Sequence, residues 1–100
     1  MTPVFAVQPD LEGVLWLSGE LDLNGAEDLR AAADAAIDPR RELVLDLSDL
    51  AFIDSSGVRA IIRVARCCPK GLLLRRPDLR VRRALEIIGI LGHGGIRIEA

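Results

Sequence analysis

The spacing of hydrophobic residues along the chain changes several times between a strand-like and a helix-like period. Residues 4–8 and 14–18 are short runs rich in β-forming side chains, and the turn-forming cluster 9–13 between them predicts a β-hairpin. Residues 43–47 form another such run, in which Asp46 is the only charged residue. A run of this kind is typical of a central strand that is covered on both faces.

Three segments repeat apolar residues at helical spacing and place charged residues on the opposite side. The first follows Asn24, which can cap a helix together with Glu27 three residues further on. The second follows residues 54–57, where a buried run gives way to an amphipathic one. The third follows residues 77–78, and Gly89 is suited to cap its C-terminus.

Two further apolar runs complete the pattern. Residues 72–74 predict a buried strand, and residues 96–98 alternate as a short edge strand would. The order strand-strand-helix-strand-helix-strand-helix-strand implies an α/β fold with a mixed, mostly parallel sheet and helices packed on it. A chain of 100 residues builds one core, so residues 1–100 are expected to form a single domain.

The net charge of -2 conceals an uneven distribution. Residues 1–54 contain 12 acidic and 3 basic residues, whereas residues 55–100 contain 10 basic and 3 acidic ones. Such a distribution can steer a charged partner. The arginines of the second and third helices either form solvated helix faces or contact that partner, and they are Arg59, Arg63, Arg66, Arg80, Arg82 and Arg83.

Several classes of protein fit the sequence poorly. Only 3% of the residues are aromatic, which argues against the stacking platforms that bind single-stranded nucleic acid. No segment approaches ~18 uncharged apolar residues, and the first ten residues do not resemble a signal peptide, so we expect a cytoplasmic protein without membrane insertion. Cys67 and Cys68 are neighbours in a helical segment and can neither bridge each other nor form a CxxC metal pair; Cys68 falls on the apolar face.

The sequence predicts no catalytic residue, metal site or cofactor. It has no glycine-rich phosphate loop, metal-ligand cluster or nucleophile elbow. Asp46, Asp49 and Asp54 could supply an acid–base pair, but acids at strand ends and turns are usually caps or solvated loop residues. His93, the only histidine, lies between glycines and is expected to be an exposed turn residue.

One short motif stands out, Asp54-Ser55-Ser56-Gly57, where a buried strand meets an amphipathic helix. Serine and aspartate at such a position satisfy the free N–H groups of a helix start, so a capped helix explains the motif. A serine at this corner can also receive a phosphate, whose charge the helix terminus tolerates. Periodicity does not decide between the two interpretations.

The motif lies within a longer resemblance. Residues 43–48, Leu-Val-Leu-Asp-Leu-Ser, and 52–58, Phe-Ile-Asp-Ser-Ser-Gly-Val, resemble the signature of STAS domains, specifically the anti-sigma factor antagonists of bacterial partner-switching systems. Residues 18–22 resemble the family's second strand and following loop, and residues 77–90 resemble its third helix. The resemblance implies a STAS fold, with the family's final helix expected to be absent because the chain stops soon after its last predicted strand.

The resemblance also implies a function without catalysis. In the family, the serine directly after the motif aspartate is phosphorylated by an anti-sigma factor that is itself a serine kinase, and here this residue is Ser55. The unphosphorylated protein binds the anti-sigma factor and frees sigma, phosphorylation breaks the complex, and a serine phosphatase restores binding. The protein is then a monomer or weak dimer that does not contact nucleic acid directly. The residues expected to contact the partner are Asp22, Asn24, Asp54, Ser56, Gly57 and Arg59.

Two alternatives remain open. The chain could be a STAS subunit that is never phosphorylated, for example in an ABC lipid-transport complex or a signalling assembly. That type often carries a different residue at the first serine position, so Ser55 favours the switch. A small-ligand sensor or nucleotide-binding module is the second alternative, but no phosphate-cradling sequence supports it.

Overall fold

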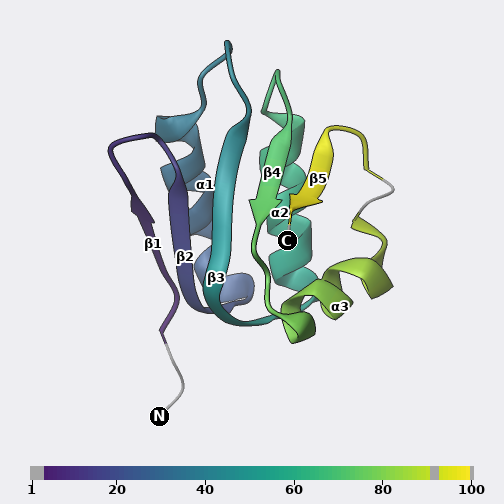
Figure 1. Ribbon diagram of the computed structural model, residues 1–100. Helices are drawn as coiled ribbons and strands as arrows, with labels where there is room; N and C mark the ends of the chain where they lie inside the picture. Colours follow the sequence, from purple (N-terminus) through teal and green to yellow (C-terminus); the bar gives the residue numbers. More distant parts are fainter. Residues whose placement is uncertain (1–3, 91–92, 100) are drawn as a thin grey trace.

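The structure is a computed structural model that describes residues 4–90 and 93–99. Its strands form one five-stranded sheet in the order β1-β2-β3-β4-β5 (Figure 1). β1 and β2 are antiparallel, and the other neighbouring strands are parallel. The mixed, mostly parallel sheet predicted from the sequence is therefore confirmed. The strands are β1 (Ala6–Pro9), β2 (Leu15–Leu21), β3 (Leu43–Ile53), β4 (Leu72–Arg75) and β5 (Ile96–Glu99).

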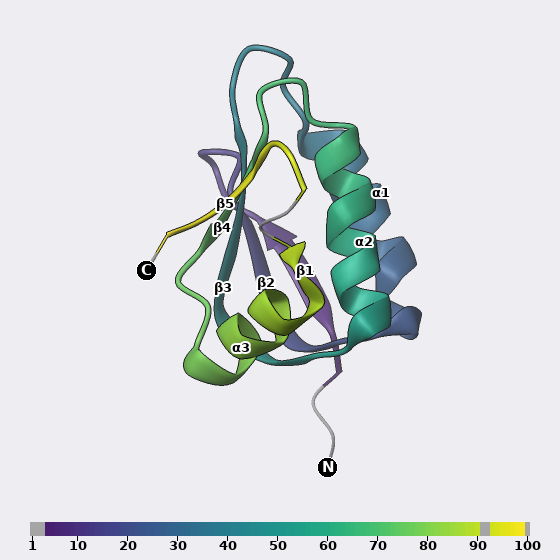
Figure 2. The ribbon, with the colours of Figure 1, turned by 90° about the vertical axis from the view of Figure 1, so that its right-hand side faces the viewer.

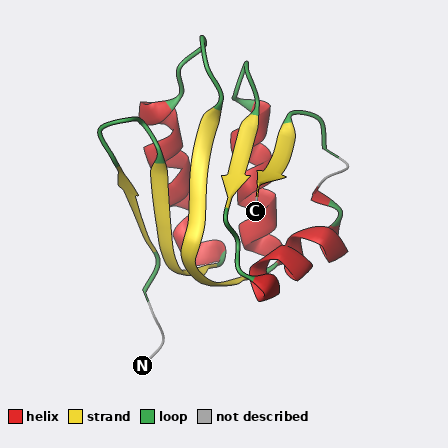
Figure 3. Cartoon of the chain, viewed as in Figure 1, coloured by secondary structure: helices red, strands yellow, loops and turns green. Residues whose placement is uncertain are grey.

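The helices fall between the strands in the predicted order. They are η1 (Leu23–Gly25), a short 3-10 helix, and the α-helices α1 (Ala26–Ala36), α2 (Ser55–Arg66) and α3 (Leu79–Ile88). α1 and α2 stand side by side against one face of the sheet, and α3 lies across its lower end, where it contacts β3 and α2 (Figures 2 and 3). No helix of the described residues is long and apolar enough to cross a membrane.

The core lies between the sheet and the pair α1 and α2. Alternate residues of β2 are buried, as expected for a strand with one face on the core. Cys68 packs against the edge of this core, as predicted, and burial together with the neighbouring Cys67 raises the pKa of its thiol to about 11. The largest fully buried side chains are Leu15, Leu17, Leu21, Leu29, Leu45, Leu47, Leu50, Ile61, Leu72, Leu74, Leu85 and Ile90.

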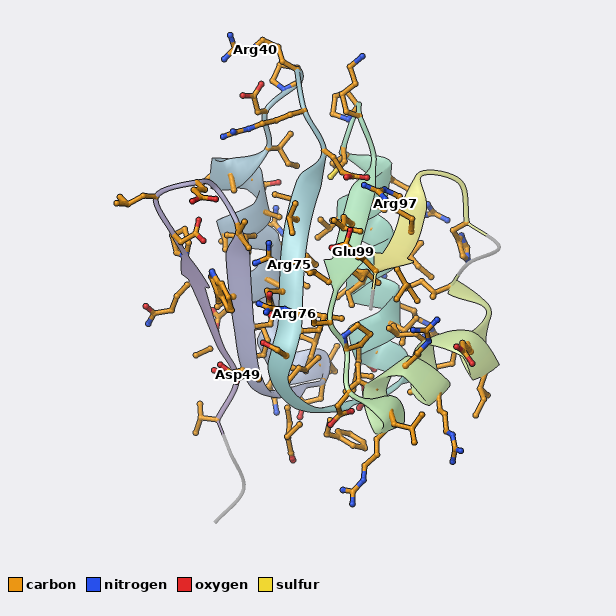
Figure 4. All side chains as sticks on the ribbon, in the orientation of Figure 1. Arg40, Asp49, Arg75, Arg76, Arg97 and Glu99 are labelled. Atoms are coloured by element: carbon orange, nitrogen blue, oxygen red, sulfur yellow. The ribbon has the colours of Figure 1, made fainter. Side chains whose placement is uncertain are left out.

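In the part of the chain that the structure describes, no helix covers most of the other face of the sheet (Figure 2). Trp16, Asp46 and Arg75 are cross-strand neighbours and therefore share this face, which we call the open sheet face. Asp46 is fully buried there. Its carboxylate accepts hydrogen bonds from Arg75 Nε at 2.7 Å and from Arg76 Nη2 at 2.6 Å. Figure 4 shows both arginines beside β3. β3 is the central strand and residues 43–47 are buried or half-buried, as predicted; on the open sheet face the cover around Asp46 comes from Arg75 and Arg76 and not from a helix.

The side chains around Asp46 compensate its charge. Burial alone would raise the pKa of Asp46, but hydrogen bonds from Ser48, Arg76 and Arg75 prevail and hold that pKa well below its ordinary value. Both guanidinium groups also lie over the Trp16 ring, with Cζ atoms 5.3 Å and 5.6 Å from its centroid. The single acidic residue inside a buried run is therefore explained by two arginines of the neighbouring segment, Arg75 at the end of β4 and Arg76 directly after it.

Candidate functional site

The candidate site lies where the parallel strands β2 and β3 end. Parallel strands place their carboxyl ends at one edge of the sheet, and ligands of α/β proteins commonly bind there. The backbone N–H of Asp54, after β3, donates to the carbonyl oxygen of Leu21, at the end of β2, over 3.3 Å. The turns that carry Asp22 and Asp54 therefore meet.

Asp54 begins α2 as a side-chain cap. Its backbone is extended, with φ -110° and ψ -174°, and its Oδ1 accepts a hydrogen bond from the backbone N–H of Gly57 over 2.9 Å. Ser55 is the first residue of α2 and is exposed, whereas Ser56 is half-buried. The capped-helix interpretation of the motif is confirmed, and Ser55 is exposed at the start of the helix.

Gly57 allows the start of α2 to approach the sheet closely. The residue is buried, and a Cβ at this position would lie 2.3 Å from the carbonyl oxygen of Leu21 and 2.7 Å from Cγ1 of Ile53. Any larger residue would push α2 away from the ends of β2 and β3. Gly57 thus fixes where Ser55 stands.

The segment after β2 differs from the prediction. Asp22 caps η1 and accepts a hydrogen bond from the backbone N–H of Asn24 over 2.9 Å, so Asn24 lies within η1 and is exposed. α1 begins at Ala26 after Gly25, without a side-chain cap. The prediction that Asn24 caps α1 is therefore wrong, because a 3-10 turn capped by Asp22 is inserted ahead of the helix.

A shallow hollow of about 320 Å³ adjoins this turn. Three carboxylates line it, those of Glu20, Asp22 and Asp28, so this side of the site is acidic. Among the described residues, no group of three His, Cys, Asp or Glu side chains is placed to hold a metal ion. Val4, Phe5 and Gly25 form the apolar part of the lining, where a Cβ on Gly25 would come within 2.8 Å of the Phe5 ring.

The outer side of α2 is basic. Arg59, Arg63 and Arg66, which we call the basic stripe, are exposed and form no ion pair with any residue that the structure describes. Arg82 of α3, in contrast, pairs with Glu86 over 3.0 Å. The site therefore has an acidic side at η1 and a basic side along α2.

Three exposed apolar side chains were not singled out by the sequence analysis. Leu23 in η1, Phe52 at the end of β3 and Leu79 at the start of α3 are 74%, 51% and 64% exposed, and we call them the apolar rim. Their elements all reach the edge of the sheet at which Ser55 lies. Leu23 and Leu79 lie outside the apolar stripes of the predicted helices, and this position could have indicated from the sequence that they are exposed. The sequence gives no such indication for Phe52.

His93 is exposed and lies away from this edge, in the segment before β5, as expected of a turn residue. Its backbone N–H donates to the carbonyl oxygen of Ile90 over 3.1 Å. The structure therefore does not bring the only imidazole to the candidate site.

Comparison with known proteins identifies the fold. The model of a family described as "Mlab, STAS domain" matches residues 5–96. An anti-sigma factor antagonist from Mycobacterium paratuberculosis shares 26% identity and superposes with a TM-score of 0.73 over 93% of this chain and 83% of its own. The anti-sigma factor antagonist SpoIIAA in its unphosphorylated form shares 21% identity, with a TM-score of 0.63 over 97% of this chain and 89% of its own.

The match to the family model extends from β1 to the start of β5, and both solved structures share the arrangement of sheet and helices. At 21% identity the likeness to SpoIIAA concerns the fold alone. The predicted STAS fold is confirmed, and the chain belongs to the STAS domain family.

Proposed function

We propose that this STAS protein is an anti-sigma factor antagonist of a partner-switching pathway. In the proposed cycle, the unphosphorylated form binds an anti-sigma factor kinase and releases sigma, and phosphorylation of Ser55 blocks this binding. The observation that carries the proposal is the exposed Ser55 at the first position of α2, directly after its capping aspartate. The likeness to an anti-sigma factor antagonist at 26% identity supports it.

The physical effect of the phosphate follows from its position. A phosphoserine adds roughly -1.5 to -2 charges at neutral pH. The positive end of the α2 dipole tolerates an anion at this place, so the fold is preserved. At an interface the same charge stands next to Asp54 and loses its hydration without a matching cation from the partner. Phosphorylation therefore removes a docking surface and leaves the protein folded.

The docking surface surrounds Ser55. The apolar rim supplies uncharged area, while the acidic hollow and the basic stripe flank it with opposite charges. Apolar contacts surrounded by polar ones are the usual composition of a protein interface. The individual residues that we assign to partner binding are Asp22, Asn24, Asp54, Ser56, Gly57 and Arg59, with Gly57 acting through the position of α2.

The rest of the proposal concerns the setting. The protein catalyses nothing itself, and a serine phosphatase regenerates the active form. We place it in the cytoplasm as a single STAS domain over residues 1–100, a monomer or weak dimer.

The test uses purified parent protein, Ser55→Ala, Ser55→Asp and the matched control Ser56→Ala, titrated calorimetrically against an anti-sigma factor kinase from the same organism. Ser55→Ala and Ser56→Ala should bind as the parent does. Ser55→Asp should bind on the order of 30-fold more weakly or worse, since burying a carboxylate that no cation of the partner matches costs about 2 to 5 kcal/mol. Incubation with kinase and ATP should place one phosphate on Ser55, as seen by mass spectrometry.

Equal affinity of Ser55→Asp and the parent would contradict the charge switch. The same holds for a phosphate that maps to Ser56 or persists in Ser55→Ala. In either case a STAS subunit that works without phosphorylation becomes the better account. Thermal melts of all variants separate loss of binding from loss of folding.

A further inference from the structure

We propose that a phosphate on Ser55 is held by Arg59 of the same helix, so that phosphorylation also withdraws Arg59 from the basic stripe. The inference rests on the proposed function, in which Ser55 is the phosphorylated residue. It adds a second consequence to the modification: the surface gains an anion at one position and loses a free cation at another.

The two residues are placed to meet. Ser55 and Arg59 are four residues apart in α2, so their side chains lie on one face of the helix with Cβ atoms about 5–6 Å apart. Both residues are exposed. Arg59 has neither an ion pair nor a side-chain hydrogen bond with any residue in the described part of the chain, so its guanidinium group is free to turn toward Ser55.

The same spacing already supports ion pairs elsewhere in this protein. Arg82 and Glu86 of α3, four residues apart, form an ion pair of 3.0 Å. Arg30 and Asp34 of α1 do so at 3.4 Å. In the proposed pair the anion precedes the cation along the helix, which is the more favourable order because each charge then opposes the helix dipole. A guanidinium group also binds phosphate through two parallel hydrogen bonds.

The other arginines of the basic stripe lie too far along α2 to replace Arg59. At 1.5 Å per residue, Arg59 lies about 6 Å from Ser55 along the helix axis, whereas Arg63 lies about 12 Å away. Arg63 is therefore a matched control, with the same charge, exposure and helix. Asp54 already accepts the Gly57 N–H and contributes only repulsion.

Other charges in the elements that pack against α2 act on the phosphate together with Arg59. They are unchanged in both variants, so each variant removes one arginine and leaves the other charges in place; Arg63, unlike Arg59, lines a pocket with Glu27, Arg30 and Asp34. These charged residues are Asp22 before η1, Glu27, Asp28, Arg30 and Asp34 of α1, Asp46 and Asp49 of β3, and Arg80, Arg82, Arg83 and Glu86 of α3 with its cap Asp78.

The test does not need the kinase. Phosphoserine is incorporated at position 55 by genetic encoding, in the parent and in Arg59→Gln and Arg63→Gln backgrounds, and the phosphate is titrated by ³¹P NMR. The second phosphate ionisation of the parent should fall below the ordinary pKa of about 6. Arg59→Gln should raise this pKa by ~0.3 to 1 unit, the size of a helical ion pair or somewhat more, and Arg63→Gln by ~0.1 unit or less.

A second readout follows the arginine itself. The Arg59 side-chain Nε–H resonance should move with the same midpoint as the phosphorus signal, and the corresponding resonance of Arg63 should not. Equal pKa changes in the two glutamine variants, or an Arg59 resonance insensitive to the phosphate, would overturn the inference. Because the phosphate is built in, this result is independent of whether a kinase acts on Ser55; failure of the proposed function would show instead in the labelling and binding experiments.

Discussion

At the scale of single residues, Asp46 depends most strongly on its surroundings. Its side chain is fully buried, yet it remains charged because two arginines and Ser48 donate to it. Removing one member of such a group leaves the others buried without a partner, which costs more than the pair contributes when intact. Arg75 and Arg76 are 27% and 50% exposed, so water offsets part of that cost.

Asp46→Asn should therefore lower the free energy of unfolding by about 2 to 3 kcal/mol, measured by urea denaturation at neutral pH. Asp34→Asn is the matched control, since Asp34 pairs with Arg30 on the exposed side of α1 and should lose no more than ~0.5 kcal/mol. The folded-state pKa of Asp46 is lowered, so its stabilisation is present above the unfolded pKa of about 4 and is lost as the pH falls below that value.

The difference in stability between parent and Asp46→Asn should consequently shrink between about pH 5 and about pH 2. A difference that stays constant over this range would show that the amide disturbs packing and not charge. If Asp46→Asn lowers the free energy of unfolding no more than Asp34→Asn does, water hydrates Arg75 and Arg76 as well as Asp46 does.

At the scale of elements, the approach of α2 to the ends of β2 and β3 determines the site. Gly57 makes this close approach possible, because the Leu21 carbonyl and the Ile53 side chain occupy the space that a Cβ would need. One of the two contacts is backbone, which cannot turn aside as a flexible side chain can. A substitution here moves the helix that presents Ser55.

Gly57→Ala should lower the free energy of unfolding by about 1 to 3 kcal/mol, the usual cost of overpacking, even though alanine favours helix over glycine by about 1 kcal/mol. Denaturant unfolding measures the loss. Gly94→Ala is the control, because a Cβ at Gly94 meets nothing within 4 Å, and it should change stability by less than ~0.5 kcal/mol. Similar stabilities of Gly57→Ala and the parent would contradict the close approach.

The sequence predicted the elements well and their connections less well. Hydrophobic periodicity identified all five strands and three α-helices of the described chain, because each has a buried side with its own period. It missed η1, since three residues are too few to show a period, and so it assigned the cap to Asn24 instead of Asp22. It could not show that arginines would cover the open sheet face, because that depends on which strands become neighbours.

Part of the candidate site could be predicted from the sequence and part could not. The motif from Asp54 to Gly57 is local, so the resemblance identified it and the structure shows its cap and its exposed serine. The apolar rim is not local: Leu23, Phe52 and Leu79 come from three segments and stay exposed only because no further element packs there among the described residues. Sequence spacing records apolar residues but not which of them remain uncovered.

At the scale of the whole molecule, the uneven charge of the sequence becomes a spatial separation. The acidic hollow belongs to the first half of the chain and adjoins the edge of the sheet where Ser55 lies, whereas the basic stripe belongs to the second half and runs along α2 away from that edge. Exposed charges act beyond contact distance at low ionic strength and orient an approaching partner. The molecule should therefore bind its partner at a rate that depends strongly on salt.

Raising NaCl from about 50 mM to about 500 mM should slow association with the proposed partner, an anti-sigma factor, by roughly 10-fold or more and change dissociation far less. Stopped-flow or surface-based kinetics measure both rates. The double variant Arg63→Gln/Arg66→Gln should show a weaker salt dependence than the parent. Electrostatic steering would be contradicted by association rates that do not change with NaCl concentration, or by a double variant whose association depends on salt as strongly as that of the parent.

The surroundings of Trp16 on the open sheet face also determine what the tryptophan fluorescence of this protein reports. Trp16 is the only tryptophan in the chain; its indole N–H donates to Asp10 over 2.9 Å, and the guanidinium groups of Arg75 and Arg76 lie over its ring. Its fluorescence is therefore sensitive to any loosening of β2, β3 and β4 from one another. Ser55 is the first residue of α2, which packs on the other face of the sheet, so we expect this emission to report unfolding and to change little on phosphorylation.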